Sequence, residues 1–217
     1  NKPLVQPLKF WSTCCTVKSV KVVPLFSGSS GNATYIRFGD RELLVDAGVS
    51  CKALQTALET LDTGLSHISG IFVTHEHHDH IRGLETVSKK FGIPVYIHES
   101  SYKGIDKPRL REALAPHVHF IAPGETVDLG DVCTSVFKTP HDACGSVGFR
   151  FNFSDGSSLG YATDIGYVTK GIAAGLLFPI AAAKVAELSP FLNFFFYPAR
   201  AVKEIRAGKY GFNLRKK

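Results

Sequence analysis

Four histidines and one aspartate lie within six residues, in the stretch Thr74-His-Glu-His-His-Asp-His80. The stretch ends an apolar run, residues 68–74, that predicts a buried strand. Alternate residues of an extended segment point to the same side, so His75 and His77 can bind one metal ion together. A solvated polar loop rarely has this composition, and we therefore interpret the stretch as a metal site.

Asp79 and His80 stand at the expected turn into a helix, where both side chains can face a second ion beside the first. Neutral imidazole and carboxylate groups suit Zn²⁺ best, and Mn²⁺ or Fe²⁺ less well. The side chain of His78 should point away from this side of the chain. We predict that neither His78 nor Glu76 is a ligand.

Two residues that follow later strands can complete the ligand set. His141 would join His75 and His77 in a group of three histidines, and Asp164 could bridge both ions. Asp46, at the end of a third strand, could accept a hydrogen bond from a ligand imidazole and fix its orientation. The sequence therefore places candidate ligands at several strand ends that a sandwich can bring together.

Such a site is suited to hydrolysis. Two divalent ions about 3.5–4 Å apart can hold a bridging hydroxide and neutralise charge on a phosphate. Water bound to such ions loses its proton near neutral pH. We expect Asp79 to orient the hydroxide for attack on phosphorus or on a carbonyl carbon, which makes Asp79 the candidate catalytic residue.

The elements that position these residues follow from the hydrophobic pattern. Apolar runs predict strands at residues 20–26, 33–38, 42–46, 68–74, 94–97, 118–122, 126–129, 132–139, 146–153 and 158–163. One helix is expected after an N-cap at Ser50, and another from near His80 to just before Gly92. Strands that alternate with helices, together with runs of antiparallel strands, predict an α/β (α+β) sandwich with helices outside the sheets.

The length of 217 residues, with 44% hydrophobic and 20% charged residues, predicts one folded domain. The net charge of +6 is uneven, because residues 1–169 carry −1 and residues 170–217 carry +7. A basic end can attract nucleic acid or an anionic surface, and a merely solvated end is the alternative. We divide the chain into an extension (1–19), a metal-binding domain (20–170) and a divergent basic segment (171–217) that includes an expected broken helix and an aromatic run.

The five cysteines form no Cys-x-x-Cys pair, and their odd number argues against a disulfide framework. A reducing compartment, the cytoplasm, is therefore expected. We expect Cys144 to pack rather than to bind metal. The sequence shows no secretory leader and no apolar run of about 20 residues that could cross a membrane. It also contains no Met, which indicates a processed or trimmed chain or a fragment.

The chain resembles the metallo-β-lactamase superfamily in the His-x-His-x-Asp-His pattern of residues 75–80. It is similar in particular to the WalJ/YycJ-type branch of bacterial cytoplasmic proteins, which are regarded as DNA exonucleases. The stretches that carry this similarity are residues 26–35, 44–50, 74–83, 141–143 and 161–167. The resemblance implies a metallo-β-lactamase-type αββα sandwich over residues 20–170. It also implies a phosphodiesterase that acts on DNA ends with two zinc or manganese ions.

The resemblance further implies a division of the ligands between the two ions. The first ion would take His75, His77 and His141, the second would take Asp79 and His80, and Asp164 would be shared. Members of the family supply another metal-binding histidine late in the chain, whereas this chain has no histidine after His141. We therefore expect the second half of the sandwich to be incomplete. The Ser/Gly loop at 27–32 would line the site, either holding a phosphate by its N–H groups or only connecting two strands.

Two other functions remain open from the sequence. The same site could hydrolyse thioesters, lactams or lactones, and the near-neutral charge of residues 1–169 gives little electrostatic preference for DNA. The chain could also be a truncated, non-catalytic relative that binds metal or nucleic acid without cutting it. The absence of a late histidine is the feature that favours this last interpretation.

Overall fold

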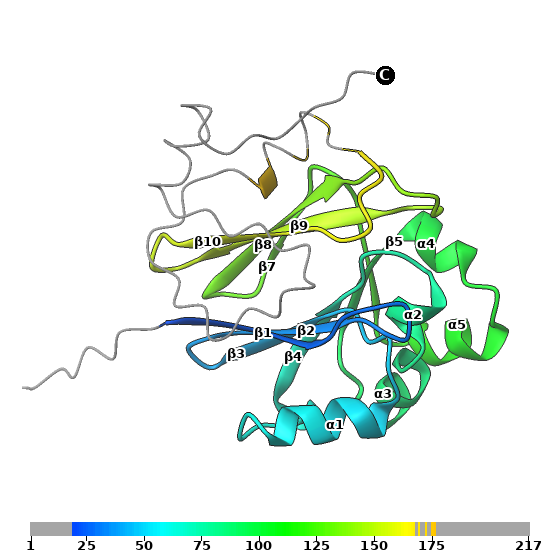
Figure 1. The fold of residues 1–217 in the computed structure, drawn as a ribbon, viewed down its shortest axis with the longest axis horizontal. Coiled ribbons are helices and arrows are strands. Elements are labelled where there is room, and N and C mark those ends of the chain that lie inside the picture. Colours follow the sequence, from blue (N-terminus) through cyan, green and yellow to red (C-terminus); the bar gives the residue numbers. More distant parts are fainter. Residues whose placement is uncertain (1–18, 168, 170–171, 173–174, 177–217) are drawn as a thin grey trace, which may run out of the picture.

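The computed structural model describes residues 19–167, 169, 172 and 175–176. Two β-sheets lie face to face, and helices cover the outer side of the larger sheet (Figure 1). This arrangement confirms the predicted α/β (α+β) sandwich. On the face of the smaller sheet that is turned away from the larger sheet, the described residues Ile172 and Leu176 cluster with Ala162 and contact Phe137. The remaining residues of the expected segment 171–217 lie outside the described part of the chain.

The larger sheet has six strands in the order in which they occur in the sequence. They are β1 Val20–Phe26, β2 Ala33–Phe38, β3 Arg41–Val45, β4 Ile68–Phe72, β5 Val95–His98 and β6 Val118–Ile121. Strands β1 to β3 are antiparallel, and β3 to β6 are parallel. The predicted hairpin between β2 and β3 is confirmed, and its turn contains Gly39 with a left-handed φ of 57°.

Five α-helices have both ends within the described residues. They are α1 Cys51–Glu59, α2 His78–Ile81, α3 Leu84–Phe91, α4 Glu99–Gly104 and α5 Pro108–Leu114. The N-cap of α1 is confirmed, because Ser50 Oγ accepts a hydrogen bond from the N–H of Ala53 at 3.2 Å. Leu54 and Leu58 of this helix are fully buried in the core beneath the larger sheet. The sequence does not predict α4 and α5, because helices this short lack a sustained apolar period.

The helix predicted from near His80 to just before Gly92 ends before Gly92 as predicted, but the structure divides it into α2 and α3 instead of one continuous helix. The division falls at Gly83, whose N–H donates to Ala47 O at 2.8 Å. A Cβ on Gly83 would lie 2.1 Å from Val49 O, so only glycine permits this approach. The contact holds α2 against the loop that follows β3, which places Asp79 and His80 at the site.

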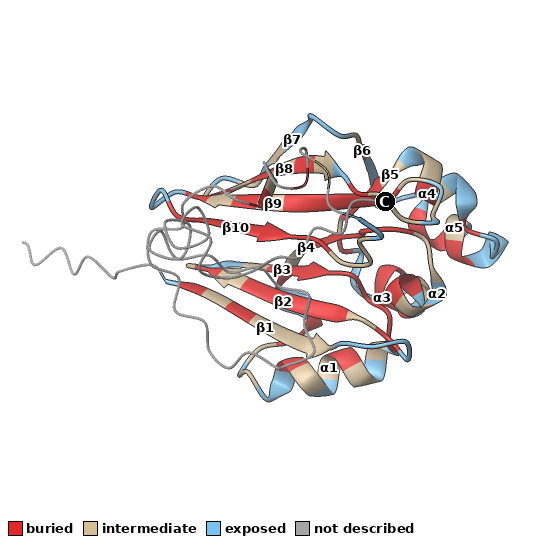
Figure 2. Cartoon of the chain, turned by 45° about the horizontal axis from the view of Figure 1, so that its top comes forward, coloured by how far each residue is buried: buried red, intermediate tan, exposed pale blue. Residues whose placement is uncertain are grey.

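The smaller sheet is an antiparallel meander in the order β10-β9-β8-β7. Its strands are β7 Thr126–Asp128, β8 Val132–Lys138, β9 Val147–Phe153 and β10 Ser158–Tyr161. Aromatic side chains fill the space between the sheets, with the ring of Phe72 lying 5.3 Å from Phe149 and 5.4 Å from Phe151. Figure 2 shows buried residues along the facing strands of both sheets. Burial of these large rings stabilises the contact between the sheets that carry the two halves of the site.

Candidate metal centre

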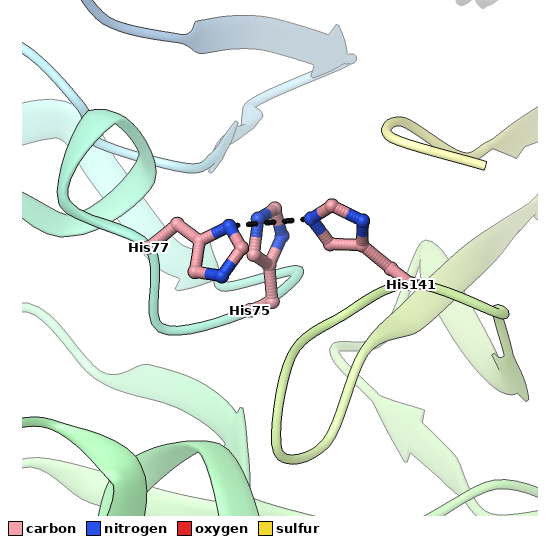
Figure 3. Close-up of side chains that lie close together, drawn as sticks. All are labelled: His75, His77 and His141. Carbon is pink, nitrogen blue, oxygen red and sulfur yellow. Dashed lines mark hydrogen bonds between the residues drawn. The ribbon is translucent and has the colours of Figure 1, made fainter. Parts of the chain in front are cut away.

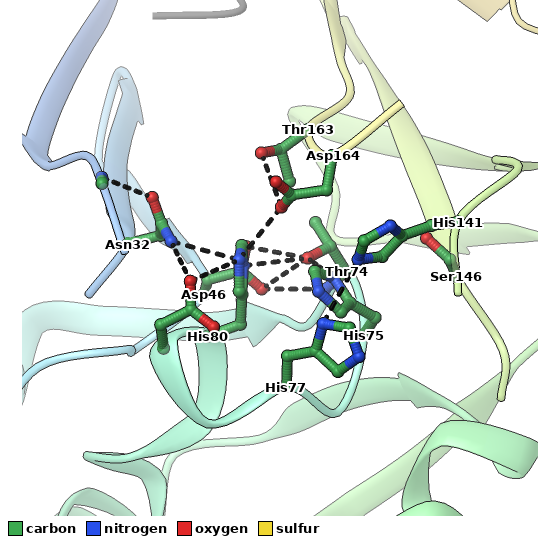
Figure 4. A network of polar contacts seen from close by, with 12 residues as sticks. Asn32, Asp46, Thr74, His75, His77, His80, His141, Ser146, Thr163 and Asp164 are labelled. Carbon is green, nitrogen blue, oxygen red and sulfur yellow. Dashed lines mark hydrogen bonds and ion pairs between the residues drawn. The ribbon is translucent and has the colours of Figure 1, made fainter. Parts of the chain in front are cut away.

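The candidate ligands lie where loops leave the two sheets at one edge of the sandwich (Figure 4). Asp46 follows β3, residues 74–80 follow β4, His141 follows β8 and Asp164 follows β10. Asp46 and Asp164 have left-handed φ values of 63° and 51°, which are uncommon for residues other than glycine. Such backbone strain is typical of functional sites, where neighbouring structure holds the residue in place.

Three histidines converge, as the sequence predicts. Ligand atoms of His75, His77 and His141 all lie within 4.8 Å of one another. Nε2 of His141 is 3.2 Å from Nδ1 of His77, and the three rings point toward a common space (Figure 3). Nδ1 of His141 is 2.9 Å from the carboxylate of Asp142, which leaves its Nε2 facing the other two rings.

His75 provides the test of whether this group fits a metal ion. Its side chain is fully buried, and its Nε2 has no hydrogen-bond partner in the described part of the chain. Burial, and then the charge of His80, lower the pKa of His75 to about 4, so the ring is neutral near pH 7. A buried, neutral imidazole with an unpartnered nitrogen is the state that binds a divalent cation. The three histidines therefore fit an ion.

A second group lies beside the first. Ligand atoms of His75, His80 and Asp164 lie within 4.8 Å of one another. Nε2 of His80 is 3.1 Å from Asp164 Oδ2 and 3.4 Å from Asp79 Oδ2. Burial alone would lower the pKa of His80, but the charge of Asp46 and the hydrogen bond to Asp164 outweigh it and raise the pKa to about 10. The hydrogen bond from His80 also lowers the pKa of Asp164 to about 2. Carboxylates that surround an imidazole in this way can hold a cation in place of the proton.

Asp46 lies beneath both groups and is completely buried. Its carboxylate accepts hydrogen bonds from the N–H of Thr74 at 2.8 Å and from Thr74 Oγ1 at 2.9 Å. It also lies 2.9 Å from Nδ1 of His80, so His80 presents Nε2 to the site. Thr74 Oγ1 gives its single proton to Asp46 and can therefore accept from Nδ1 of His75 at 3.0 Å. Asp46 and Thr74 together orient both imidazoles.

Asn32 and Thr74 are two residues of the site that sequence reasoning missed. Nδ2 of Asn32 donates to Asp79 Oδ2 at 2.9 Å and lies 3.1 Å from Nε2 of His80. The N–H of Asn32 donates to Asp79 O, and the N–H of Gly48 donates to Asn32 O, both at 2.8 Å. A Cβ on Gly48 would lie 1.5 Å from Asp79 O, so this packing requires glycine. The only sequence signal for Asn32 was its position in the Ser/Gly loop.

The Ser/Gly loop uses some of its backbone donors internally. The N–H of Gly28 donates to Asn32 Oδ1 at 3.0 Å, and the N–H of Gly31 donates to Gly28 O at 3.0 Å. These two groups are therefore engaged within the loop rather than free for a phosphate. The loop instead positions Asn32, which holds Asp79.

Glu76 and His78 belong to neither group of converging ligand atoms, and neither does Asp79, which the sequence proposes as a ligand. His78 is exposed at the start of α2. Glu76 Oε1 accepts a hydrogen bond from the N–H of Cys144 at 2.6 Å. Burial would raise the pKa of Glu76, but hydrogen bonds, first of all that from Cys144, lower it. Cys144 is exposed and is likewise absent from both groups.

A groove of about 510 Å³ opens beside His77. Its lining includes the basic residues Arg82 and Lys107 and the acidic residues Glu85 and Asp106. Its volume suits a group of nucleotide or small-ligand size. Its mixed charge does not by itself select an anionic substrate.

The fold and the site together define a metallo-β-lactamase-type sandwich, and comparison with known proteins agrees. The sequence model of a protein family, described as the β-lactamase superfamily domain, matches residues 41–186. The solved structure of zinc-bound PqqB from Methylobacterium extorquens is similar in fold, with a TM-score of 0.53, 21% identity, and coverage of 66% of this chain and 56% of that one. The chain belongs to the β-lactamase superfamily.

Curated relatives include two exonucleases. Over 155 residues the chain is 35% identical to the exodeoxyribonuclease YycJ of Bacillus anthracis, covering 70% of this chain and 58% of that protein. It is 33% identical to the exodeoxyribonuclease WalJ of Streptococcus pneumoniae, covering 69% of this chain and 55% of that protein. A hydroxyacylglutathione hydrolase of Wigglesworthia glossinidia is 31% identical, covering 55% of this chain and 43% of that protein. The chain thus spans a little over half the length of the two exonucleases. No helix among the described residues has the length and apolar character needed to cross a bilayer.

Proposed function

We propose that this chain is a metal-dependent hydrolase that cleaves phosphodiester bonds at DNA ends. The observation that carries the proposal is the pair of adjoining ligand groups, with the unpartnered Nε2 of buried His75 between them. The identity to two exodeoxyribonucleases supports DNA as the substrate class. The reducing environment indicated by the odd cysteine count supports a cytoplasmic location.

In this proposal His75, His77 and His141 would hold one divalent ion. Asp79 and His80 would hold a second ion, with Asp164 available to both ions, although Asp79 lies outside the group of converging ligand atoms formed by His75, His80 and Asp164. Zinc is the metal best suited to these donors, with manganese or iron as alternatives. When bound, such ions neutralise charge on a phosphate and supply hydroxide near neutral pH.

The side chains of the site have separate roles in orienting the nucleophile, fixing a ligand imidazole and accommodating the substrate. Asp79, whose Oδ2 accepts a hydrogen bond from Asn32 at 2.9 Å, would orient the attacking hydroxide. Asp46 fixes the Nδ1–H tautomer of His80 from below. The groove beside His77 provides space for the part of the substrate next to the scissile bond.

The proposal is tested with end-labelled single-stranded DNA and the full chain, supplied with Zn²⁺ or Mn²⁺. We expect hydrolysis in the wild type and its loss, by about 10²–10⁴-fold, in His77→Ala and in Asp79→Ala. His67→Ala is the matched control, because His67 is exposed and lies outside both ligand groups. Hydrolysis that persists in either site variant would contradict the proposal.

A thioester substrate provides the second arm of the experiment, because a hydroxyacylglutathione hydrolase is also similar to the chain. Cleavage of a small thioester but not of DNA would assign the same site to the alternative hydrolase. Salt-sensitive DNA binding with no hydrolysis of either substrate would indicate a non-catalytic relative.

A further inference from the structure

Glu76 stands between two candidate ligands, His75 and His77, yet its side chain points to another part of the chain. Its Oε1 accepts a hydrogen bond of 2.6 Å from the backbone N–H of Cys144, 68 residues later in the sequence. Cys144 lies three residues after His141. A single carboxylate thus connects the two segments that supply the three converging histidines.

The loop that carries His141 is short and closed at its base. Thr139 Oγ1 lies 2.6 Å from Ser146 Oγ, and the N–H of Thr139 donates to Ser146 O at 3.1 Å. Next to this closure, the N–H of Val147 donates to Thr74 O at 3.0 Å. The base of the loop is therefore fixed to the strand end before His75, and the bond to Glu76 fixes its far side.

Close packing against α4 leaves this loop little freedom. A Cβ on Gly145 would lie 2.4 Å from His98 Nδ1, just before α4, and 3.0 Å from Ser101 N. A Cβ on Gly104, at the other end of α4, would lie 2.8 Å from Cys144 Sγ and 3.3 Å from Glu76 Cγ. Three segments far apart in the sequence meet around Glu76.

We propose that Glu76 is a positioning residue for the first metal ion. By accepting the Cys144 N–H, it sets where His141 stands relative to His75 and His77. Nε2 of His141 lies 3.2 Å from Nδ1 of His77 in this arrangement. The inference rests on the proposed metal site and adds to it a residue that does not touch the ion. Groups that orient metal ligands from outside typically contribute about 10- to 100-fold to metal affinity.

The test uses Co²⁺ as the probe, because its absorption spectrum reports ligand geometry and its affinity can be measured by competition with a chelator. We expect Glu76→Ala to weaken Co²⁺ binding at the site of His75, His77 and His141 about 10- to 100-fold and to change the spectrum of that site. Glu76→Gln keeps a side-chain oxygen that can accept the Cys144 N–H, so we expect it to restore most of the affinity. Circular dichroism establishes that each variant is folded.

Two controls separate this role from others. Glu99→Ala removes an exposed carboxylate of α4 that pairs with Lys103, and we expect wild-type Co²⁺ binding. Cys144→Ser keeps the backbone N–H and removes the thiol, so wild-type binding is expected there as well. A large loss in Cys144→Ser would instead assign the effect to the thiol and overturn the inference.

The outcomes distinguish this inference from the proposed function. If the wild type binds Co²⁺ and Glu76→Ala binds it equally well with the same spectrum, the inference is wrong and the metal site stands. If Glu76→Ala does not fold, Glu76→Asp replaces it, because the shorter side chain withdraws the carboxylate and should weaken binding in the same way. If the wild type binds no Co²⁺, the proposed function and the inference fail together.

Discussion

Replacement of Asp46 by Asn is the change whose effect the structure defines best. Asp46 is fully buried and contacts both Thr74 and His80. Its left-handed φ of 63° is a conformation that Asn adopts readily, so the backbone is not disturbed. The amide oxygen of Asn can still accept the Thr74 N–H. The substitution therefore removes one negative charge beside His80, and it replaces Oδ2, which accepts from Thr74 Oγ1 and lies 2.9 Å from Nδ1 of His80, by an NH₂ group that cannot accept.

The expected loss of stability follows from this geometry. Removal of one partner from a buried ion pair typically costs about 3–5 kcal/mol. The cost here is reduced, because His80 can release its proton and because the hydrogen bond to Thr74 N–H, which contributes about 1 kcal/mol, is retained. We expect the metal-free Asp46→Asn protein to be about 2–3 kcal/mol less stable than the wild type near pH 7.

The pH dependence gives the prediction its sign. The pKa of His80 rises from 6.5 to about 10 on folding, so the stabilisation is fully present below pH 6.5 and is lost as pH rises through 10. The measurement is urea unfolding of both proteins, freed of metal by a chelator, at several pH values between 6 and 10. The difference in unfolding free energy should shrink toward pH 10. A difference that is the same across this range would refute the ion pair.

Three further predictions concern the site and the core. Asn32→Ala should weaken the second metal ion about 10- to 100-fold and leave the first largely intact, which stepwise metal titration can measure. Metal binding should release about one proton from His80 at pH 8. The release is measured as a heat of metal binding that depends on the buffer, and this dependence should disappear in His80→Gln. A heat of binding to the wild type that is the same in every buffer would contradict the prediction. Phe72→Ala, in the core between the sheets, should cost about 3–5 kcal/mol in urea unfolding, whereas a loss below about 1 kcal/mol would show that the sheets are not packed as described.

Sequence was a good guide where the signal is local. Residues 75–80 form one short stretch after a buried strand. Because alternate side chains of an extended chain point to the same side, His75 and His77 could be predicted to lie together. The strands of both sheets were predicted within a few residues, because apolar runs bounded by turns are sufficient to find them. Asp46, His141 and Asp164 could be proposed because strand ends at one edge of a sandwich meet in space.

Contacts between segments far apart in the sequence could not be predicted from local sequence patterns. The role of Asn32 depends on Gly48, where a side chain would clash with Asp79 O. No sequence pattern around Asn32 or Gly48 predicts this contact. The break between α2 and α3 depends on Gly83 approaching the loop after β3, a tertiary contact that overrides helical propensity. The bond from Glu76 to Cys144 likewise exists only once the His141 loop packs against α4.

The most direct test of the central claim, a dinuclear metal site on this chain, is the metal content of the folded protein measured by plasma mass spectrometry. The two adjoining ligand groups predict close to two divalent ions per molecule in the wild type. His77→Ala should fall to about one ion, because it removes a ligand of the first group only. A wild-type protein that retains one ion or none, after dialysis against Zn²⁺ and removal of the excess, would contradict the dinuclear site.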